Sequence, residues 1–289
     1  MVTRKTTQLA TGNSMVTQLP IWPSEVRGMP NSLARSALFN CSSLRAGTRR
    51  VYRRKVVAAL KGISIEYSGD ELRQDDSDAF MQILHVGRIH QLGTKVRFTA
   101  HSMLKELKWS TSSVGYTRLV DCLLRLSTTT LQVTVELPGS TGRASFGGSL
   151  VRLFRWKEEQ TDSPMREWEI ELEPEIIALF GSDSYSRIEW EMRLELSPIE
   201  KWLHSFYHSH RDPFPFKVAS LRELMDSSIK ELKGFRYKLK FALDKLVAVG
   251  FLESYMIDAH DLVHVVRKGR VGHREMQAIS RMPKTDAMF

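Results

Sequence analysis

The sequence has little cysteine and no long apolar run, and both shortages exclude whole classes of protein. Cys41 and Cys122 are the only cysteines among 289 residues, and neither belongs to a Cys-x-x-Cys pair. This argues against a disulfide framework and against a thiolate zinc site. No apolar run approaches the roughly 20 residues of a membrane span, and residues 1–15 lack the apolar centre of a signal peptide. We expect a cytoplasmic protein without a membrane partner.

The sequence also lacks the short motifs of several enzyme classes. The glycine-rich stretch at 138–149 does not end in Gly-Lys-Ser/Thr, so it is not a P-loop. His204 and His208 lie four residues apart, but no His-Glu-x-x-His motif and no third ligand accompany them. His208-Ser209-His210 has a small polar centre, unlike the His-hydrophobic-His motif of rolling-circle nicking enzymes. We expect packed or phosphate-contacting histidines, no metal, no cofactor and no enzymatic activity.

Basic charge is what the chain has in excess. Its 42 Lys and Arg against 33 Asp and Glu give a net charge of +9 and a pI near 9.6. This balance favours an anionic partner such as nucleic acid. The length suits one large or two modest domains, and 42% hydrophobic residues are enough for real cores. Residues 44–55 carry six cations and no acid, which indicates either a solvated linker or a phosphate contact.

Residues 218–267 have the pattern of a DNA-binding module. A short apolar helical pattern breaks at 226–228, and a longer helix with one apolar stripe follows. Gly250 ends that helix, and two strand-like runs flank a turn at 258–260. This order is typical of a winged helix-turn-helix, which lays its second helix in the major groove of DNA.

The longer helix has a basic outward face. Residues 217–250 hold eight Lys and Arg against four Asp and Glu, and the outward cations crowd the end that reads base edges. The hairpin then exits into basic residues, where a wing would meet phosphates. Simple solvation of the lysines, packing of Tyr237 on the wing and packing of Phe241 on another module are the alternatives. The expected DNA contacts are Lys230, Lys233, Arg236, Tyr237, Lys238, Arg267 and Lys268.

The same order of elements occurs earlier in the chain. Helix, strand, short helix and longer helix are predicted at 75–91, 96–99, 101–109 and 113–126. A strand at 129–137, the glycine-rich turn and a strand at 150–156 are predicted to form the wing. Arg118 and Arg125 are the candidate DNA contacts here, although this less basic face suits a protein contact equally well.

The sequence therefore predicts an α+β fold with two tandem winged-helix domains and a disordered N-terminal tail. Ser197, Pro198 and Glu200 form the N-terminal signature of a strong helix in the second domain. The predicted divisions are a flexible tail at 1–20, an ordered lead-in with the basic segment at 21–57, the first winged-helix domain at 58–164, the second at 165–268 and a basic flexible tail at 269–289.

A short apolar segment near the N-terminus has two interpretations. Gln18, Leu19, Ile21 and Trp22 surround Pro20, and such a segment can dock in a partner's groove with each side chain filling a pocket. Alternatively, Ile21 and Trp22 anchor the tail on its own domain.

Several strings of the sequence resemble the TrfA family, the replication initiators of broad-host-range plasmids. The resemblance covers about residues 18–268, and MPNSLARSALF is its most specific string. The others are WPSEVRG, EYSGDELRQDD, YTRLVDCLLRL, SHRDPFPFKV and GFLESYMIDAHDLVH. Residues 18–22 also resemble the family's Gln-Leu-Ser-Leu-Phe-like motif for the sliding clamp, with departures at the third and last positions.

The resemblance implies a function and a set of partners. A TrfA-type initiator binds iterons, the direct repeats of the plasmid origin, opens the origin with the host initiator DnaA, recruits the replicative helicase and contacts the sliding clamp. Single-stranded origin DNA and a monomer–dimer equilibrium belong to the same expectation. A winged-helix transcriptional repressor and a rolling-circle nicking enzyme are the alternative functions.

Overall fold

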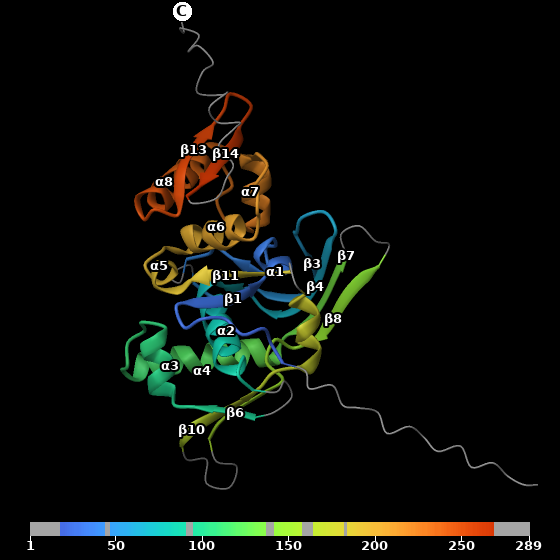
Figure 1. The fold of residues 1–289 in the computed structure, drawn as a ribbon, viewed down its shortest axis with the longest axis vertical. Helices are drawn as coiled ribbons and strands as arrows, with labels where there is room; N and C mark the ends of the chain where they lie inside the picture. The colour runs from blue at the N-terminus through green and yellow to red at the C-terminus, as the bar shows by residue number, and fades with distance from the viewer. Residues whose placement is uncertain are drawn as a thin grey trace, which may run out of the picture.

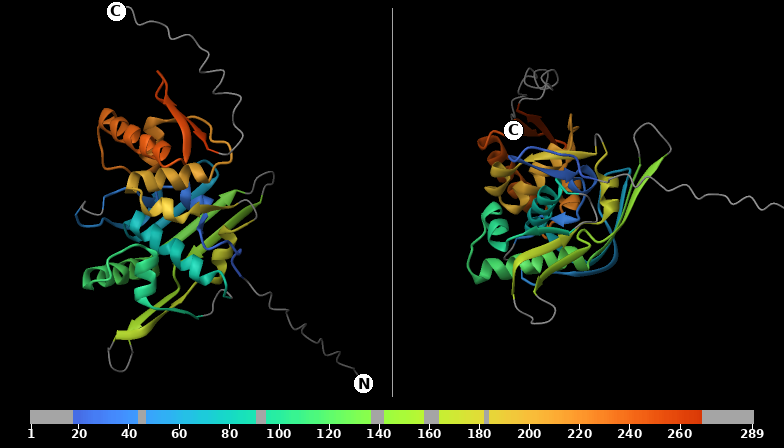
Figure 2. Two further views of the ribbon diagram at one scale, coloured as in Figure 1. Left: turned by 60° about the vertical axis from the view of Figure 1, so that its left-hand side comes forward. Right: turned by 60° about the horizontal axis from the view of Figure 1, so that its bottom comes forward.

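Two hydrophobic cores follow one another along the chain. The structure, a computed structural model, describes residues 18–43, 47–90, 95–136, 142–157, 164–181 and 184–268. The first core gathers side chains from Leu19 to Trp190 and the second from Leu196 to Val263. The cores succeed each other along the long axis of a mixed α+β molecule (Figures 1 and 2). Of the flexible tails predicted at 1–20 and 269–289, residues 1–17 and 269–289 lie outside the described residues.

The first core contains a repeat of helices and strands. Its elements are α2 (Gln74–Gly87), β6 (Lys95–Phe98), α3 (Ala100–Glu106), α4 (Ser113–Thr128), β9 (Leu153–Lys157) and β10 (Pro164–Glu171). The strand β10 lies between β6 and β9 and pairs antiparallel with both. Leu119, Leu123 and Leu126 recur on one side of α4 and are fully buried, so the apolar stripe fixes the inward face of this helix.

The second core contains a repeat with the same order. Its elements are α6 (Pro198–His208), β12 (Phe216–Lys217), α7 (Val218–Leu224), α8 (Leu232–Ala248), β13 (Leu252–Ile257) and β14 (Leu262–Arg267). The last strand again lies in the middle, in the order β12-β14-β13. The predicted start of α6 is confirmed, because Pro198 takes the first helical position and the Ser197 amide donates to the Glu200 carboxylate at 2.7 Å.

The turn between the short and the long helix has the same form in both repeats. Lys108, two residues after α3, has a φ of 53°, and Asp226, two residues after α7, has a φ of 44°. Residues other than glycine rarely adopt this left-handed conformation. Its recurrence at the same place indicates that the two repeats share one architecture.

The hairpin of the first repeat differs from the prediction. The strand β7 (Thr130–Glu136) pairs with β8 (Arg143–Gly148) and with β4 (Ile63–Asp70), which pairs with β3 (Val51–Val57). These four strands form a separate sheet beside the repeat (Figure 1). The hairpin of the first repeat is β9–β10 instead. Because β10 begins at Pro164, the predicted domain boundary between 164 and 165 falls at the start of this strand. The cores themselves divide between Trp190 and Leu196.

Short elements and one buried polar cluster join the repeats. The short elements are β1 (Val26–Pro30), α1 (Asn31–Ala34), β2 (Phe39–Asn40), β5 (Leu72–Arg73), η1 (Pro174–Leu179), β11 (Tyr185–Glu189) and α5 (Trp190–Leu194). Arg193 of α5 is fully buried and donates to Asp78 of α2 at 2.7 Å and to Ser205 of α6 at 2.7 Å. An unpaired buried guanidinium is costly, so this cluster fixes α6 against α2. No helix within the described ranges is long and apolar enough to cross a membrane.

Candidate nucleic-acid interface

The outward face of α8 is basic and aromatic. The inward face buries Phe235, Leu239, Ala242, Leu243 and Leu246. The exposed cations and aromatic residues on the other side and in the preceding turn are Lys230, Lys233, Tyr237, Lys238, Lys240, Phe241 and Lys245, and the exposed acids are Glu231 and Asp244. Tyr237 is 61% exposed and Phe241 is 55% exposed. The alternatives that packed Tyr237 on the wing and Phe241 on another module are therefore wrong.

Arg236 lies at the edge of this face. It forms an ion pair with Asp261, which lies at the turn between β13 and β14, and both side chains are partly exposed. The pair ties the helix to the hairpin. A phosphate contact by Arg236 would compete with this carboxylate.

The structure separates the two DNA contacts that were predicted at the exit of the hairpin, Arg267 and Lys268. Lys268 is exposed. Arg267 is buried, and its Nη1 lies 3.3 Å from the carbonyl oxygens of Tyr207 and His208 at the end of α6. Its guanidinium also lies over the Phe251 ring, 4.9 Å from the centroid. The predicted DNA contact by Arg267 is thus corrected, because a cation at a helix C-terminus binds the last carbonyls of that helix.

The predicted contacts on α4 belong to a cluster of arginines around two buried aspartates. Arg125 contacts Asp76 at 2.8 Å, and Arg118 contacts Asp75 at 3.8 Å while its guanidinium lies 3.7 Å from the Trp109 ring centroid. Both aspartates begin α2, where the helix dipole favours negative charge. Burial disfavours the charged form of Asp75, but Arg49 and Arg118 outweigh it and hold the pKa of this carboxyl below its usual value.

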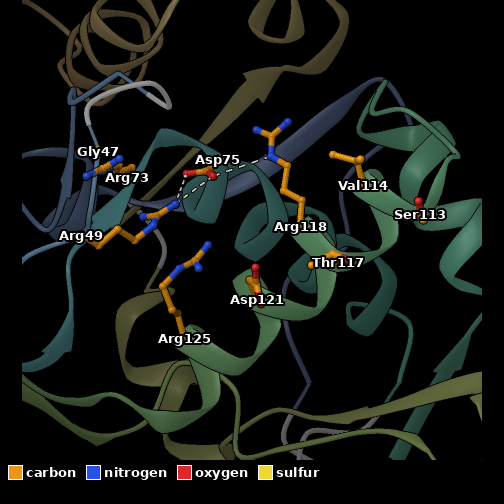
Figure 3. A pocket seen from close by; sticks show the side chains of 10 residues that line it. All are labelled: Gly47, Arg49, Arg73, Asp75, Ser113, Val114, Thr117, Arg118, Asp121 and Arg125. Carbon is orange, nitrogen blue, oxygen red and sulfur yellow. Dashed lines mark hydrogen bonds and ion pairs between the residues drawn. The ribbon is translucent and has the colours of Figure 1, made fainter.

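An open pocket of about 550 Å³ lies over this cluster. Figure 3 shows Arg49 and Arg118 on opposite sides of Asp75, with Arg125 beside them. Four arginines and two aspartates line the pocket, and each arginine pairs with the carboxylate of Glu71, Asp75 or Asp76. The lining residues are Gly47, Arg49, Arg73, Asp75, Ser113, Val114, Thr117, Arg118, Asp121 and Arg125.

One group of potential metal ligands lies beneath the same pocket. Among the described residues, Asp75, Asp76 and Cys122 bring ligand atoms within 4.8 Å of one another. Arginines already contact both carboxylates, with Arg49 at 2.9 and 2.6 Å. Burial also raises the pKa of the Cys122 thiol well above its usual value, and a metal binds the thiolate. The group is therefore better described as an ion-pair cluster.

The basic segment at 44–55 is partly a strand. Its last residues form the edge strand β3, and in the described part Arg53 is exposed, while Arg54 pairs with Glu66 at 2.8 Å. Arg50 and Lys55 contact Asp226 at 2.7 and 3.1 Å. Since Asp226 lies in the turn before α8, this segment links the four-stranded sheet to the second repeat. The linker interpretation is wrong for its described part from residue 47 on.

The segment 18–22 is anchored in the first core. Leu19 and Trp22 are 2% and 1% exposed, and Ile21 is 67% exposed. The Trp22 indole donates to His85 Nδ1 at 3.1 Å and stacks on Phe180. Gln18 Nε2 donates to a backbone carbonyl at 3.0 Å.

The interpretation of this segment as a docking motif is corrected by that packing. Of its apolar side chains, Leu19 and Trp22 already fill pockets of their own domain, and Ile21 alone faces outward. The predicted flexible tail therefore ends before Leu19.

The two histidines of α6, His204 and His208, and His210 just after this helix are buried. His204 Nε2 and His208 Nε2 lie 3.4 and 2.9 Å from the Glu189 carboxylate, and His210 Nδ1 lies 2.7 Å from the Phe206 carbonyl. Burial lowers the pKa of His204 to about 4 and that of His210 to about 4. These side chains pack in the core, as one of the two alternatives predicted, and do not face a phosphate.

Sequence reasoning missed the aspartates that organise the arginines of α4. Asp75 and Asp76 are adjacent acids at a helix start, and the cation-rich segment with Arg49 lies about 25 residues before them. This complementarity of charge was the available signal. It also missed Arg193, because nothing in the local pattern of α5 distinguishes a buried arginine from an exposed one.

A sequence model described as "TrfA protein" matches residues 3–267. The chain belongs to the TrfA family. The plasmid replication initiator protein TrfA of Escherichia coli is 29% identical over 247 residues, which are 85% of this chain and 63% of that relative. This TrfA-family chain thus spans less than two thirds of the relative's length.

The fold of this chain resembles that of domains 2 and 3 of RctB. A crystal structure of selenomethionine derivatives of these domains aligns with a TM-score of 0.56 and 16% identity, over 83% of this chain and 98% of that one. A second structure of the same domains aligns with a TM-score of 0.51 and 14% identity, over 84% and 98% of the two chains. At these identities the likeness concerns the fold.

Proposed function

We propose that this TrfA-family chain initiates plasmid replication by binding iterons at the plasmid origin, as a cytoplasmic protein without enzymatic activity. Its Escherichia coli relative is a plasmid replication initiator protein, which supports the role in plasmid replication. The observation that carries the DNA-binding part is the outward face of α8, where exposed lysines stand opposite a fully buried apolar stripe. Lysines on an exposed helix face are suited to the phosphates of a duplex.

We infer that both repeats are winged helices. Each has the order helix, strand, short helix, long helix and hairpin, with the last strand in the middle of its sheet. In such a module the second helix of the pair enters the major groove, which assigns α8 to that role in the second repeat. Lys233 and Lys238 then meet the duplex, and Lys268 follows the hairpin where a wing reaches the phosphates.

The first repeat offers a second contact with the duplex. Arg49, Arg118 and Arg125 line the pocket beside α4, and guanidinium groups are good donors to phosphate oxygens. Their ion pairs with buried aspartates hold the guanidinium groups in place. Two contact regions on one rigid chain would set the register on an iteron.

We propose the host partners of the protein from its membership in the TrfA family. The host initiator DnaA and the replicative helicase would meet the protein at the opened origin, and single-stranded origin DNA and a monomer–dimer equilibrium belong to the same scheme. We do not propose clamp contact through residues 18–22, because Leu19 and Trp22 are buried in the first core.

The decisive experiment measures binding of the chain to a duplex of its cognate plasmid origin. Lys233→Ala and Lys238→Ala should weaken binding. A lost phosphate contact lowers the salt slope by about one, and a lost base contact relaxes specificity at one position by about 1–3 kcal/mol. Lys245→Ala is the matched control, because it removes the same charge from the far end of α8.

Three outcomes separate the candidate functions. Equal affinity of the Lys233→Ala, Lys238→Ala and wild-type proteins would overturn the assignment of α8. A footprint over direct repeats, together with plasmid maintenance by the wild type only, supports initiation. Binding to an operator without any support of plasmid replication would make the protein a repressor.

A further inference from the structure

Two aromatic side chains stand side by side on the outward face of α8. The rings of Tyr237 and Phe241 meet edge to face with centroids 4.6 Å apart, and the side chains are 61% and 55% exposed. Single exposed apolar residues are ordinary on protein surfaces. Here two adjacent rings lie near the centre of the face opposite the buried stripe. A partner that binds the outward face of α8 would therefore contact both rings.

Lysines border the aromatic pair on both sides. At 100° per residue, Asp244 also lies beside the pair, and its carboxylate accepts from the Tyr255 hydroxyl at 2.6 Å. Lys233 and Lys240 lie to one side of the line from Tyr237 to Phe241, and Lys238 lies to the other. All three are exposed. A second copy of the chain presenting the same face would bring like charges together, which is unfavourable. A polyanion with apolar groups on its surface fits both the charge and the rings.

We propose that Tyr237 and Phe241 read thymine in the major groove of duplex DNA by apolar contact with its C5-methyl group. This inference rests on the proposed function of α8. The thymine methyl is the apolar group that the major groove displays, and aromatic side chains contact it. Four residues of helix rise span about 6 Å, or about two base-pair steps at 3.4 Å each. The ring centroids lie 4.6 Å apart, so the pair addresses base pairs that are one or two steps apart, while the lysines hold the backbone.

The test removes single methyl groups from the DNA. The probe is a duplex that the wild-type protein selects from a pool of random sequences, with each thymine replaced in turn by uracil. At one or two positions the replacement should weaken wild-type binding about fourfold, the factor that corresponds to about 0.8 kcal/mol for one buried methyl. Tyr237→Ala and Phe241→Ala should bind the thymine duplex more weakly and lose sensitivity to uracil, each at its own position.

Lys233→Ala is the control for weakened binding in general, and it should keep the sensitivity to uracil. Both aromatic side chains are exposed, so their alanine variants should melt like the wild type. Wild-type binding that is unaffected by uracil at every position overturns the inference. So does unchanged DNA binding by both alanine variants, and an accompanying change in self-association would assign the face to a protein partner. Failure to select any duplex would overturn the proposed function itself.

Discussion

Glycine occupies the same place near the start of the long helix in both repeats, with different physical reasons. Gly115 and Gly234 are each the third residue of α4 and α8. A Cβ on Gly115 would lie 1.7 Å from the Ser110 carbonyl oxygen, so the first repeat requires glycine. A Cβ on Gly234 would lie 3.5 Å from Ile229, an ordinary contact. The second repeat therefore does not need glycine for its own packing.

Replacing Gly234 by alanine should separate stability from DNA binding. Gly234→Ala should leave the free energy of unfolding unchanged or raise it by up to about 1 kcal/mol, because glycine is a poor helix former. The added methyl stands on the face that approaches the duplex, so it should weaken DNA binding. Urea unfolding and a duplex titration on the same variant measure both quantities.

Gly115→Ala serves as the matched control, and it should lower the stability because of the clash with Ser110. Equal DNA affinity of Gly234→Ala and wild type would show that the start of α8 does not approach DNA closely.

At the scale of elements, the segment 18–22 acts as an anchor for the start of the described chain. Trp22→Ala removes a fully buried indole and its hydrogen bond to His85, and should lower the free energy of unfolding by about 3–5 kcal/mol. Ile21→Ala is the neighbouring control, since Ile21 is exposed and surface changes usually stay within about 0.5 kcal/mol. Chemical unfolding of both variants measures this. A Trp22→Ala protein that unfolds like the wild type would contradict the anchor.

The long helices were predictable because their signal is local. In α8 and α4 the buried apolar side chains recur at helical spacing, from Phe235 to Leu246 and from Leu119 to Leu126, and in α6 the capping residues mark the start. Alternation in β7 was also visible, but it is the same whether the strand pairs with β9 or with β4. The choice depends on distant strands, which explains why the hairpin β9–β10 was missed.

In the candidate site, too, only the features that depend on the local sequence could be predicted. Tyr237 and Lys238 were correctly predicted to face outward, because helical periodicity fixes the direction of a side chain. The burial of Arg267 was not predictable, because it depends on where the end of α6 lies in space. The anchoring of Trp22 was one of the two interpretations of residues 18–22, and it is confirmed for Trp22 but wrong for Ile21. Gly28 gives the indole its space, because a Cβ there would come within 2.6 Å of it.

For the whole molecule, buried neutral histidines occur in both cores. Burial lowers the pKa of His85 to about 3, and those of His204 and His210 to about 4 each. An unfolded chain has histidine pKa values near 6.5. Between about pH 4 and 6.5 the unfolded state therefore binds more protons than the folded state, and stability rises with pH.

The stability of the whole molecule should therefore fall as the pH is lowered from 7.5 to 5. Each histidine contributes up to about 1.4 kcal/mol per pH unit within this window, and above about pH 7.5 the contribution is complete. Urea unfolding at several pH values measures the slope. The series stops at pH 5 because Glu71 also loses its stabilising contribution in stronger acid. Burial raises the pKa of this carboxyl, but its arginine partners outweigh burial and lower the pKa to about 2.

His85→Gln should reduce the slope of stability against pH by the share of one histidine, up to about 1.4 kcal/mol per pH unit. His90→Gln, at an exposed position, should leave the slope unchanged. Stability independent of pH from 7.5 to 5 would show that these histidines are protonated in the folded protein.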